Sequence, residues 1–251
     1  MNIRTIIRQS LILAKYEIKL RNEGSYLGIL WYLLNPIILF VLLFFIFRHL
    51  TGNDIELYPL YLLLGIIMYN LFQNVTNLSV KVINTKAELI KSIPFQKEVL
   101  ILSMLIAGIF VHIFELLLFG ILLIIFKINP IGIIFYPLIL AFYALFIYGL
   151  SLIVSSICTR ITDVNYIWHF FARLVFFVTP IFHQFDENSK LFLINLINPL
   201  YYFITIAREI IVYNSLPNPF IVIGAVSFSL IFLIIGIMVF NSQENKFVEI
   251  I

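Results

Sequence analysis

Six long apolar stretches constrain the fold of this chain more than any other feature. They cover residues 30–48, 58–78, 99–126, 131–157, 165–183 and 219–240. A transmembrane helix needs about 20 largely apolar residues, whereas the strands of a membrane β-barrel alternate apolar and polar residues in short segments. These stretches are long and do not alternate, and a helix satisfies its own backbone hydrogen bonds in lipid. The sequence therefore predicts an all-α polytopic membrane protein with six spans, in a single transmembrane domain over residues 1–251.

The composition excludes several other classes of protein. Of the 251 residues, 62% are hydrophobic and only 12% are charged, whereas a soluble domain has about 25% charged residues. A soluble surface so poor in charge would aggregate, and a disordered chain would be less hydrophobic. Cys158 is the single cysteine, which argues against a disulfide framework and against cysteine-pair zinc sites. We expect no metal site, and the net charge of +3 is too small to argue for a nucleic-acid partner.

The placement of the basic residues predicts the orientation in the membrane. Eleven of the 16 Lys and Arg residues fall on the side that holds both termini, four fall on the other side, and Arg173 lies inside a span. Loops rich in Lys and Arg stay in the cytoplasm. We therefore expect a multi-pass protein of the cytoplasmic membrane with both termini in the cytoplasm.

Residues 1–29 are predicted to form a helix on the membrane surface and a turn that leads into the first span. At 100° per residue, a basic stripe lies beside an apolar stripe, which is typical of an interfacial helix. The basic stripe contains Arg4, Arg8, Lys15 and Lys19. Gly24 and Gly28 permit the tight turn that follows.

One face of the second span is polar. Asn70, Gln73, Asn74 and Asn77 fall within about 100° of each other on a helical wheel. Lipid does not tolerate such a face, so it meets either another helix or a wet pathway. We take these four residues as candidates for a permeation path. Tyr69 and Phe177 join them, because aromatic rings along a path could stack on sugar rings.

Two charged residues lie deep in predicted spans, Glu115 in the third and Arg173 in the fifth. Intramembrane charges are costly and are usually paired or functional. A direct pair is one interpretation, although the depths of the two residues differ by about 10 Å at the helical rise per residue. The other two interpretations are that the charges tether helices to each other or that they take part in transport.

Residues 79–98 form the largest internal segment on the cytoplasmic side. Residues 86–93 are predicted to form a short amphipathic helix that ends before a proline. We expect its apolar side chains to be exposed, and an exposed apolar patch of this kind favours a protein partner. The candidate residues for contact with such a partner are Leu89, Ile90, Lys91, Ile93, Pro94 and Phe95.

Residues 184–218, between the fifth and sixth spans, are predicted to form an outer hairpin. Two apolar pieces, Leu191–Ile197 and Tyr201–Val212, are each too short to span, and Asn198-Pro199 separates them. Such short pieces indicate a re-entrant or interfacial hairpin, which would form a helical plug at the outer mouth. The candidate gate residues are Asn198, Pro199, Tyr201, Tyr202 and Arg208.

Taken together, these segments resemble the permease subunits of ABC-2 type exporters that export polysaccharides, such as O-antigen and teichoic-acid precursors. The similarity rests on the order of several loose motifs along nearly the whole chain. They are residues 21–36 with Gly28, Trp31 and Pro36, residues 89–98, Arg160 and Asp163 followed by residues 176–182, residues 198–202 with Arg208-Glu209, and residues 246–249. In place of the adjacent Arg-Asp pair common in the family, Arg160 and Asp163 are separated by two residues.

The resemblance implies a homodimer of this chain bound to two copies of an ABC-type ATPase subunit. ATP and Mg would bind to that partner, which would push on the coupling segment. A lipid-linked glycan would then move along a path bordered by the first, second and fifth spans and closed by the outer hairpin. The chain itself would have no cofactor and no catalytic residue. In agreement with this, it contains no Gly-x4-Gly-Lys-Ser/Thr motif.

Three alternatives stay open at the level of sequence. A permease for a drug or a small lipid in the same superfamily would be expected to have large outer loops. A membrane-embedded transferase would need clustered carboxylates or histidines near one interface, and the four histidines are scattered. A secondary transporter would show inverted repeats and helix breaks at mid-membrane, whereas the breaks here lie near the predicted surfaces.

Overall fold

The structure, a computed structural model, describes residues 3–48, 55–92, 95–184, 192–244 and 247, and this part of the chain is helical and contains no strand. Its helices are α1 (Ile3–Asn22), α2 (Trp31–Arg48), α3 (Tyr58–Thr85), α4 (Ala87–Ser92), α5 (Glu98–Ile125), α6 (Tyr136–Arg160), α7 (Val164–Val178), α8 (Phe192–Ile197), α9 (Pro199–Ala207) and α10 (Pro219–Glu244). Short helical turns precede α2 (η1, Gly28–Leu30) and α6 (η2, Pro130–Phe135), and a π-helical turn follows α9 (η3, Arg208–Val212). The prediction of an all-α polytopic membrane protein is confirmed.

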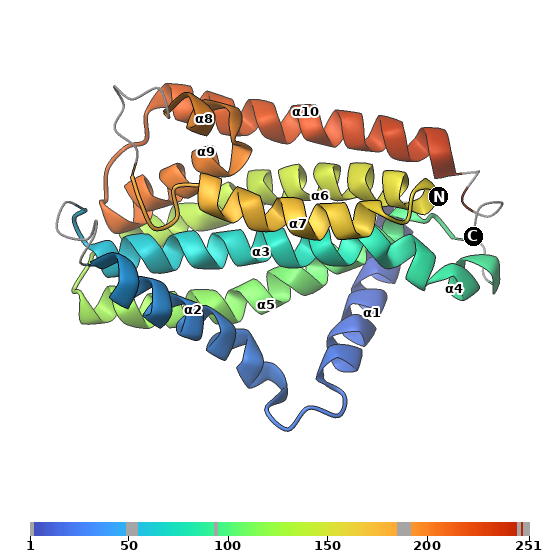
Figure 1. The fold of residues 1–251 in the computed structure, drawn as a ribbon, viewed down its shortest axis with the longest axis horizontal. Helices are drawn as coiled ribbons and strands as arrows, with labels where there is room; N and C mark the ends of the chain where they lie inside the picture. The colour runs from blue at the N-terminus through green and yellow to red at the C-terminus, as the bar shows by residue number, and fades with distance from the viewer. Residues whose placement is uncertain (1–2, 49–54, 93–94, 185–191, 245–246, 248–251) are drawn as a thin grey trace.

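Helix α3 is the centre of the bundle (Figure 1). It packs against α2, α5, α6 and α7, and most of its side chains are buried. Aromatic contacts fix these neighbours, since Phe72 lies against Phe146 of α6 and Trp168 of α7. Most of the surface of this helix is therefore covered by protein.

Helices α6 and α10 lie side by side along most of their length (Figure 1). Two glycines permit their close approach. A Cβ atom at Gly149 would come within 2.3 Å of the Phe232 carbonyl oxygen, and one at Gly236 within 2.3 Å of the Gly149 carbonyl oxygen. Small residues at such a crossing are typical of membrane helix pairs, because there the helices associate by close packing.

Four helical segments of the described chain are long and apolar enough to cross a membrane, and they correspond to four of the six predicted spans. They are Trp31–Arg48, Glu98–Ile125, Pro130–Arg160 and Pro219–Glu244. Helix α3 has the required length but carries the four amides, and α7 has only 15 residues. The predicted fifth span, 165–183, is too long at its C-terminal end, because the helix stops at Val178 and Thr179 is extended before Pro180.

The two ends of the bundle carry different elements (Figure 1). Helix α4, the first turns of α1 and the last turn of α10 lie at one end, which we name the α4 end. Lys97, between α4 and α5, bonds to Glu244 at the end of α10 through its backbone N–H (3.1 Å) and its side chain (3.9 Å). Helices α8 and α9 lie at the other end, which we name the hairpin end.

Helix α1 has the expected amphipathic character. Its basic residues Arg4, Arg8, Lys15 and Lys19 are exposed, and the small residues Ser10 and Ala14 are buried against the bundle. Several large apolar side chains of α1 face away from the protein, namely Ile7, Leu11, Ile12, Tyr16 and Leu20. An apolar surface beside exposed basic residues suits a membrane interface. The turn after α1 uses positive φ at Gly24 (76°) and Gly28 (46°), as their sequence positions predicted.

Candidate functional site

The predicted coupling helix exists as α4, but it is less exposed than expected. Ile90 is buried in an apolar cluster that includes Ile83 of α3, Ile101 of α5 and Phe240 of α10, with Leu89 and Phe95 packed against it. The expectation of a fully exposed apolar set is therefore wrong, because helix ends from several parts of the chain cover it. Lys91 is exposed. Ile93 and Pro94 lie outside the described residues.

A shallow apolar groove remains at the α4 end. It has a volume of about 160 Å³ and is lined by Gln9, Ile12, Leu13, Leu89, Phe95 and Val99. It therefore joins α1, the coupling segment and the start of α5. Glu17 of α1 holds this arrangement together, since it pairs with Arg21 at 3.4 Å and with Lys86 at 3.6 Å. The groove is thus an apolar surface shared by α1, the segment after α4 and α5.

The amide face of α3 is divided between two environments. Asn70 turns inward and donates a hydrogen bond to Glu115 Oε1 of α5 at 3.2 Å. Asn74 is exposed on the surface of the protomer, while Gln73 and Asn77 are half-buried. The Asn77 Oδ1 atom is buried without a hydrogen-bond partner among the described residues. One amide thus joins helices, and the other three lie at or near the protomer surface.

Glu115 forms hydrogen bonds with neighbours other than Arg173. His112, one turn earlier in α5, contacts Glu115 Oε2 through Nδ1 at 3.1 Å, and its Nε2 contacts the hydroxyl of Tyr136 in α6. Both carboxylate oxygens therefore have partners from the bundle interior. The direct Glu115–Arg173 pair, one of the interpretations that the sequence left open, is not formed. In this structure Glu115 connects α3, α5 and α6.

Arg173 instead lies on the exposed face of α7. It has no hydrogen bond or ion pair within the described part of the chain. The same face carries Tyr166, Phe170 and Phe177, each at least 60% exposed. Tyr69, in contrast, is buried and donates its hydroxyl to the Ala172 carbonyl, so its ring lies in the core of the protomer. The exposed face of α7 thus combines one arginine with several aromatic rings.

At the hairpin end, the predicted break between two short helices is confirmed, since α8 ends at Ile197 and α9 begins at Pro199. Asn198 accepts a hydrogen bond from the backbone N–H of Leu200 (3.1 Å), which caps α9, and Pro199 occupies the first position of that helix. The Asn198 amide also donates to Thr179 Oγ1 at 2.8 Å, which ties the hairpin to the end of α7. Tyr202 donates its hydroxyl to the Leu196 carbonyl and so holds α8 against α9.

Arg208 is the most completely coordinated residue of the hairpin. It is 4% exposed, and its guanidinium donates to the carbonyls of Tyr61 (2.9 and 3.2 Å), Pro180 (2.6 Å) and Ile181 (2.9 Å). Its Cζ lies 3.3 Å from the centroid of the Tyr61 ring. In the described residues no carboxylate lies within ion-pair distance of it. Burial lowers the pKa of Arg208, and the nearby tyrosines oppose this shift.

Residues that the sequence interpretation missed complete this cluster. Tyr58 donates to the Phe182 carbonyl at 3.1 Å, and Tyr61 donates to those of Pro180 (3.2 Å) and His183 (2.9 Å). Residues 180–183 therefore present their carbonyls to α3 and η3. Arg208, an arginine in an apolar hairpin, was the sequence signal that could have predicted this cluster, because a buried guanidinium requires several hydrogen-bond acceptors nearby.

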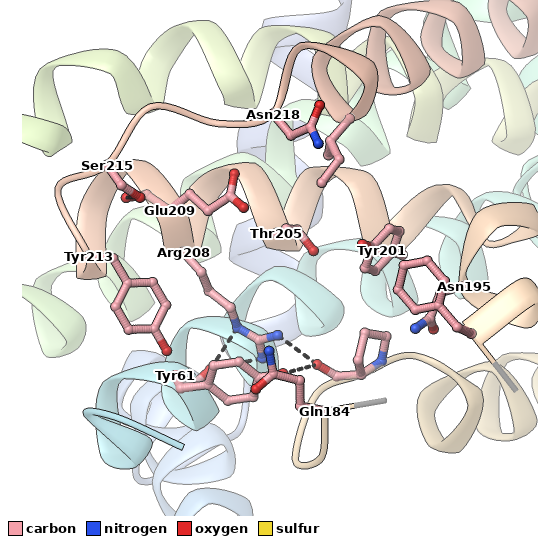
Figure 2. A pocket seen from close by; sticks show the side chains of 13 residues that line it. Tyr61, Gln184, Asn195, Tyr201, Thr205, Arg208, Glu209, Tyr213, Ser215 and Asn218 are labelled. Carbon is pink, nitrogen blue, oxygen red and sulfur yellow. Dashed lines mark hydrogen bonds between the residues drawn. The ribbon is translucent and has the colours of Figure 1, made fainter. Parts of the chain in front are cut away.

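An outer cavity of about 400 Å³ lies next to Arg208 (Figure 2). Its lining includes Asn195, Tyr201, Thr205, Arg208, Glu209 and Tyr213. Two of these, Tyr201 and Arg208, belong to the predicted gate, and the cavity brings them together with α8 and the loop before α10. Arg208 and Glu209 point in opposite directions (Figure 2). Burial raises the pKa of the Glu209 carboxyl above its ordinary value, and a backbone hydrogen bond partly offsets this shift.

Comparisons with known proteins agree with this architecture. The sequence profile described as "ABC-2 type transporter" matches residues 8–212. The chain is 23% identical over 242 residues to the O-antigen export system permease protein RfbA of Myxococcus xanthus. This alignment covers 94% of this chain and 93% of the relative. It is 25% identical over 243 residues to the protein of the same name from Klebsiella pneumoniae, with 96% and 93% covered. Since the profile covers most of the sequence, the chain belongs to the ABC-2 type transporter family, as a multi-pass membrane component of a transporter without catalytic function of its own.

Proposed function

We propose that this chain is the permease subunit of an ATP-driven exporter that moves a lipid-linked polysaccharide across the cytoplasmic membrane. It acts as a homodimer with two copies of an ABC-type ATPase, a partner that membership in the family implies. ATP and Mg bind to the ATPase. Helices α3 and α7 cross the membrane beside the four long apolar helices, which gives six spans with both termini in the cytoplasm.

The single observation that carries this proposal is the exposed face of α7. An arginine with no ion pair in the described chain, at span depth among exposed aromatic rings, is costly in lipid. It becomes tolerable where the face meets water, a polar substrate or a second copy of the chain. Aromatic rings beside a charge suit a substrate made of sugar rings. Asn74, exposed on α3, and the half-buried Gln73 and Asn77 supply further polar groups.

The groove at the α4 end is the proposed contact with the ATPase. Leu89 and Phe95 line it, and Ile90 anchors α4 to the core below. A push on α4 would reach α3 directly, because only Lys86 separates the two helices. It would also reach α10 through the Lys97–Glu244 contact and α1 through the Lys86–Glu17 pair. The coupling segment, residues 79–98, thus connects the ATPase with three helices of the permease.

The hairpin of residues 184–218 is the proposed outer gate. Its two short helices are too short to span, and its contacts end on the outer parts of α3 and α7 through Arg208 and Asn198. A gate of this kind opens when those contacts loosen. Polysaccharide as the cargo is supported by the printed function of the relatives, O-antigen export, over almost the whole chain. Export of a drug or a small lipid is the second candidate within the same family.

Deletion of the gene in the native host tests the proposal. We expect the surface polysaccharide to disappear and its lipid-linked form to accumulate inside the cell, and the full-length gene on a plasmid to restore both. Surface polysaccharide that stays unchanged while sensitivity to a toxic small molecule rises would favour the second candidate instead.

Cysteine labelling tests the path separately. In a Cys158→Ala background, Asn74→Cys should react with a water-soluble thiol reagent, because only the thiolate reacts and water must therefore reach it. Leu71→Cys on the buried side of the same helix is the matched control and should stay unlabelled. Equal labelling of the two positions would contradict the claim that water reaches the amide face of α3.

A further inference from the structure

The outer cavity contains an acceptor that the described protein leaves unused. Asn195 of α8 is 1% exposed and lines the cavity, yet its Oδ1 atom has no hydrogen-bond partner among the described residues. Buried polar atoms almost always have a partner, because an unmade hydrogen bond costs the full desolvation of the group. An orphan acceptor on a side chain that lines a cavity therefore marks a position for a donor from a ligand.

The charges around the cavity favour a neutral ligand. Arg208 and Glu209 both line it and carry opposite charges. Four of the five guanidinium N–H groups of Arg208 are used by backbone carbonyls. The Glu209 Oε2 atom is buried without a partner in the described chain. An anion would meet this carboxylate and find most of the arginine donors occupied. A ligand with hydroxyl groups would instead donate to Glu209 and to Asn195.

The remaining walls suit the apolar faces of a sugar. Tyr201 and Tyr213 line the cavity from α9 and from the residue after η3, and Thr205 lies between them along the chain (Figure 2). Aromatic rings bury the C–H faces of a sugar, while a few placed polar groups fix its hydroxyls. The volume of about 400 Å³ falls within the range of small-ligand sites.

We propose that the outer cavity binds a neutral sugar ring of the exported glycan, held by Asn195, Thr205 and Glu209 against Tyr201 and Tyr213. The inference rests on the proposed function and adds a glycan-binding site within each protomer, next to the gate. A ring held there stays on the hairpin side while the ATPase resets, so the site opposes backward sliding of the polymer.

Binding of released glycan to the intact transporter tests this site. The probe is a set of oligosaccharides released by mild acid from the surface polysaccharide of the host. It is titrated against the complex of permease and ATPase in lipid nanodiscs, and saturation-transfer NMR follows binding. Thr205→Trp fills the cavity and should weaken binding about tenfold or more. Ile131→Trp in η2 is the control, because Ile131 is exposed outside the cavity and should bind like the wild type.

A second variant separates a binding role from a structural one. Asn195→Leu removes the orphan oxygen, so the fold should become as stable as the wild type or more so in thermal unfolding. Binding of the oligosaccharides should nevertheless fall about tenfold. Wild-type affinity in both Thr205→Trp and Asn195→Leu, or no binding to a wild-type complex that exports glycan normally, would overturn the inference and leave the proposed function intact. A gene deletion that leaves surface glycan unchanged would overturn the proposed function itself.

Discussion

The guanidinium of Arg208 lies over the ring of Tyr61, with 3.3 Å between Cζ and the ring centroid, and also donates to the carbonyl of the same residue. One side chain of the hairpin thus binds both the ring and the backbone of one residue near the start of α3. The same guanidinium reaches the carbonyls of Pro180 and Ile181 after α7. Three parts of the chain that are distant in sequence therefore meet at a single cation.

Arg208→Lys should loosen this cluster although it keeps the charge. An ammonium has three donors and no planar face, so it cannot bind three carbonyls and stack on Tyr61 at once. We expect the variant to lose about 2 kcal/mol or more in the free energy of unfolding, since hydrogen bonds to charged groups are among the stronger ones. Thermal unfolding of the purified protein measures this. Arg21→Lys, at a partly exposed ion pair, is the control and should cost less than about 1 kcal/mol.

Gly65→Ala should have a similar effect from the opposite side of the cluster. A Cβ atom at Gly65 would come within 2.6 Å of Arg208 Nη2, which would push the guanidinium from its carbonyls. Gly120→Ala in α5 is the matched control, because nothing lies within 4 Å of its Cβ position. Alanine favours helix by about 1 kcal/mol over glycine, so the control should be neutral or stabilising. Equal stability of the two variants would argue against a tight Gly65–Arg208 contact.

Glu209 should make stability depend on pH. Burial raises the pKa of its carboxyl above the ordinary 4.5, so the folded state holds the proton more tightly than the unfolded state. The corresponding contribution to stability is fully present below pH 4.5 and is lost as the pH rises through the raised pKa. Glu209→Gln should therefore stabilise the protein at about pH 7 and have less effect at about pH 4. A difference between variant and wild type that does not change with pH would contradict this assignment.

The double variant Leu89→Ala with Phe95→Ala should uncouple ATP hydrolysis from export. Both side chains line the apolar groove, and truncation of buried anchors at an interface typically costs about 2 kcal/mol or more in binding. We expect weaker co-purification of the ATPase and reduced export at normal membrane insertion. Ile124→Ala, on an exposed apolar surface of α5, is the control and should behave like the wild type. Unchanged co-purification together with unchanged export would exclude the groove as the coupling contact.

Local sequence signals predicted the helices well where each signal is self-contained. The alternation of basic and apolar stripes predicted α1, and Asn198-Pro199 predicted the break between α8 and α9 because an N-cap and a proline act within a few residues. That the amide face of α3 avoids lipid stays a prediction. Its division between Glu115 and the protomer surface depends on which helices pack beside it, which helical periodicity does not report.

The cluster around Arg208 could not be predicted in the same way. Two of its partners are the backbone carbonyls of residues 180 and 181, which the hydropathy of residues 165–183 assigned to a continuous helix. Hydropathy does not report that the helix ends at Val178, so it could not place these carbonyls beside Arg208. The coupling segment shows the same limit, since Ile90 is buried by residues of α5 and α10 that lie far along the chain. Hydropathy counts apolar residues but does not say which of them meet.

The central claim is tested most directly by transport in proteoliposomes that contain this chain, the ATPase and the lipid-linked glycan of the host. Glycan that reaches the opposite face is detected by an added glycosidase that cannot cross the membrane. We predict that the glycan becomes accessible only when both subunits and ATP are present, and that Leu89→Ala with Phe95→Ala reduces this transport. Transport by this chain without the ATPase or without ATP would contradict the account, as would ATP hydrolysis by the full complex that leaves all the glycan protected.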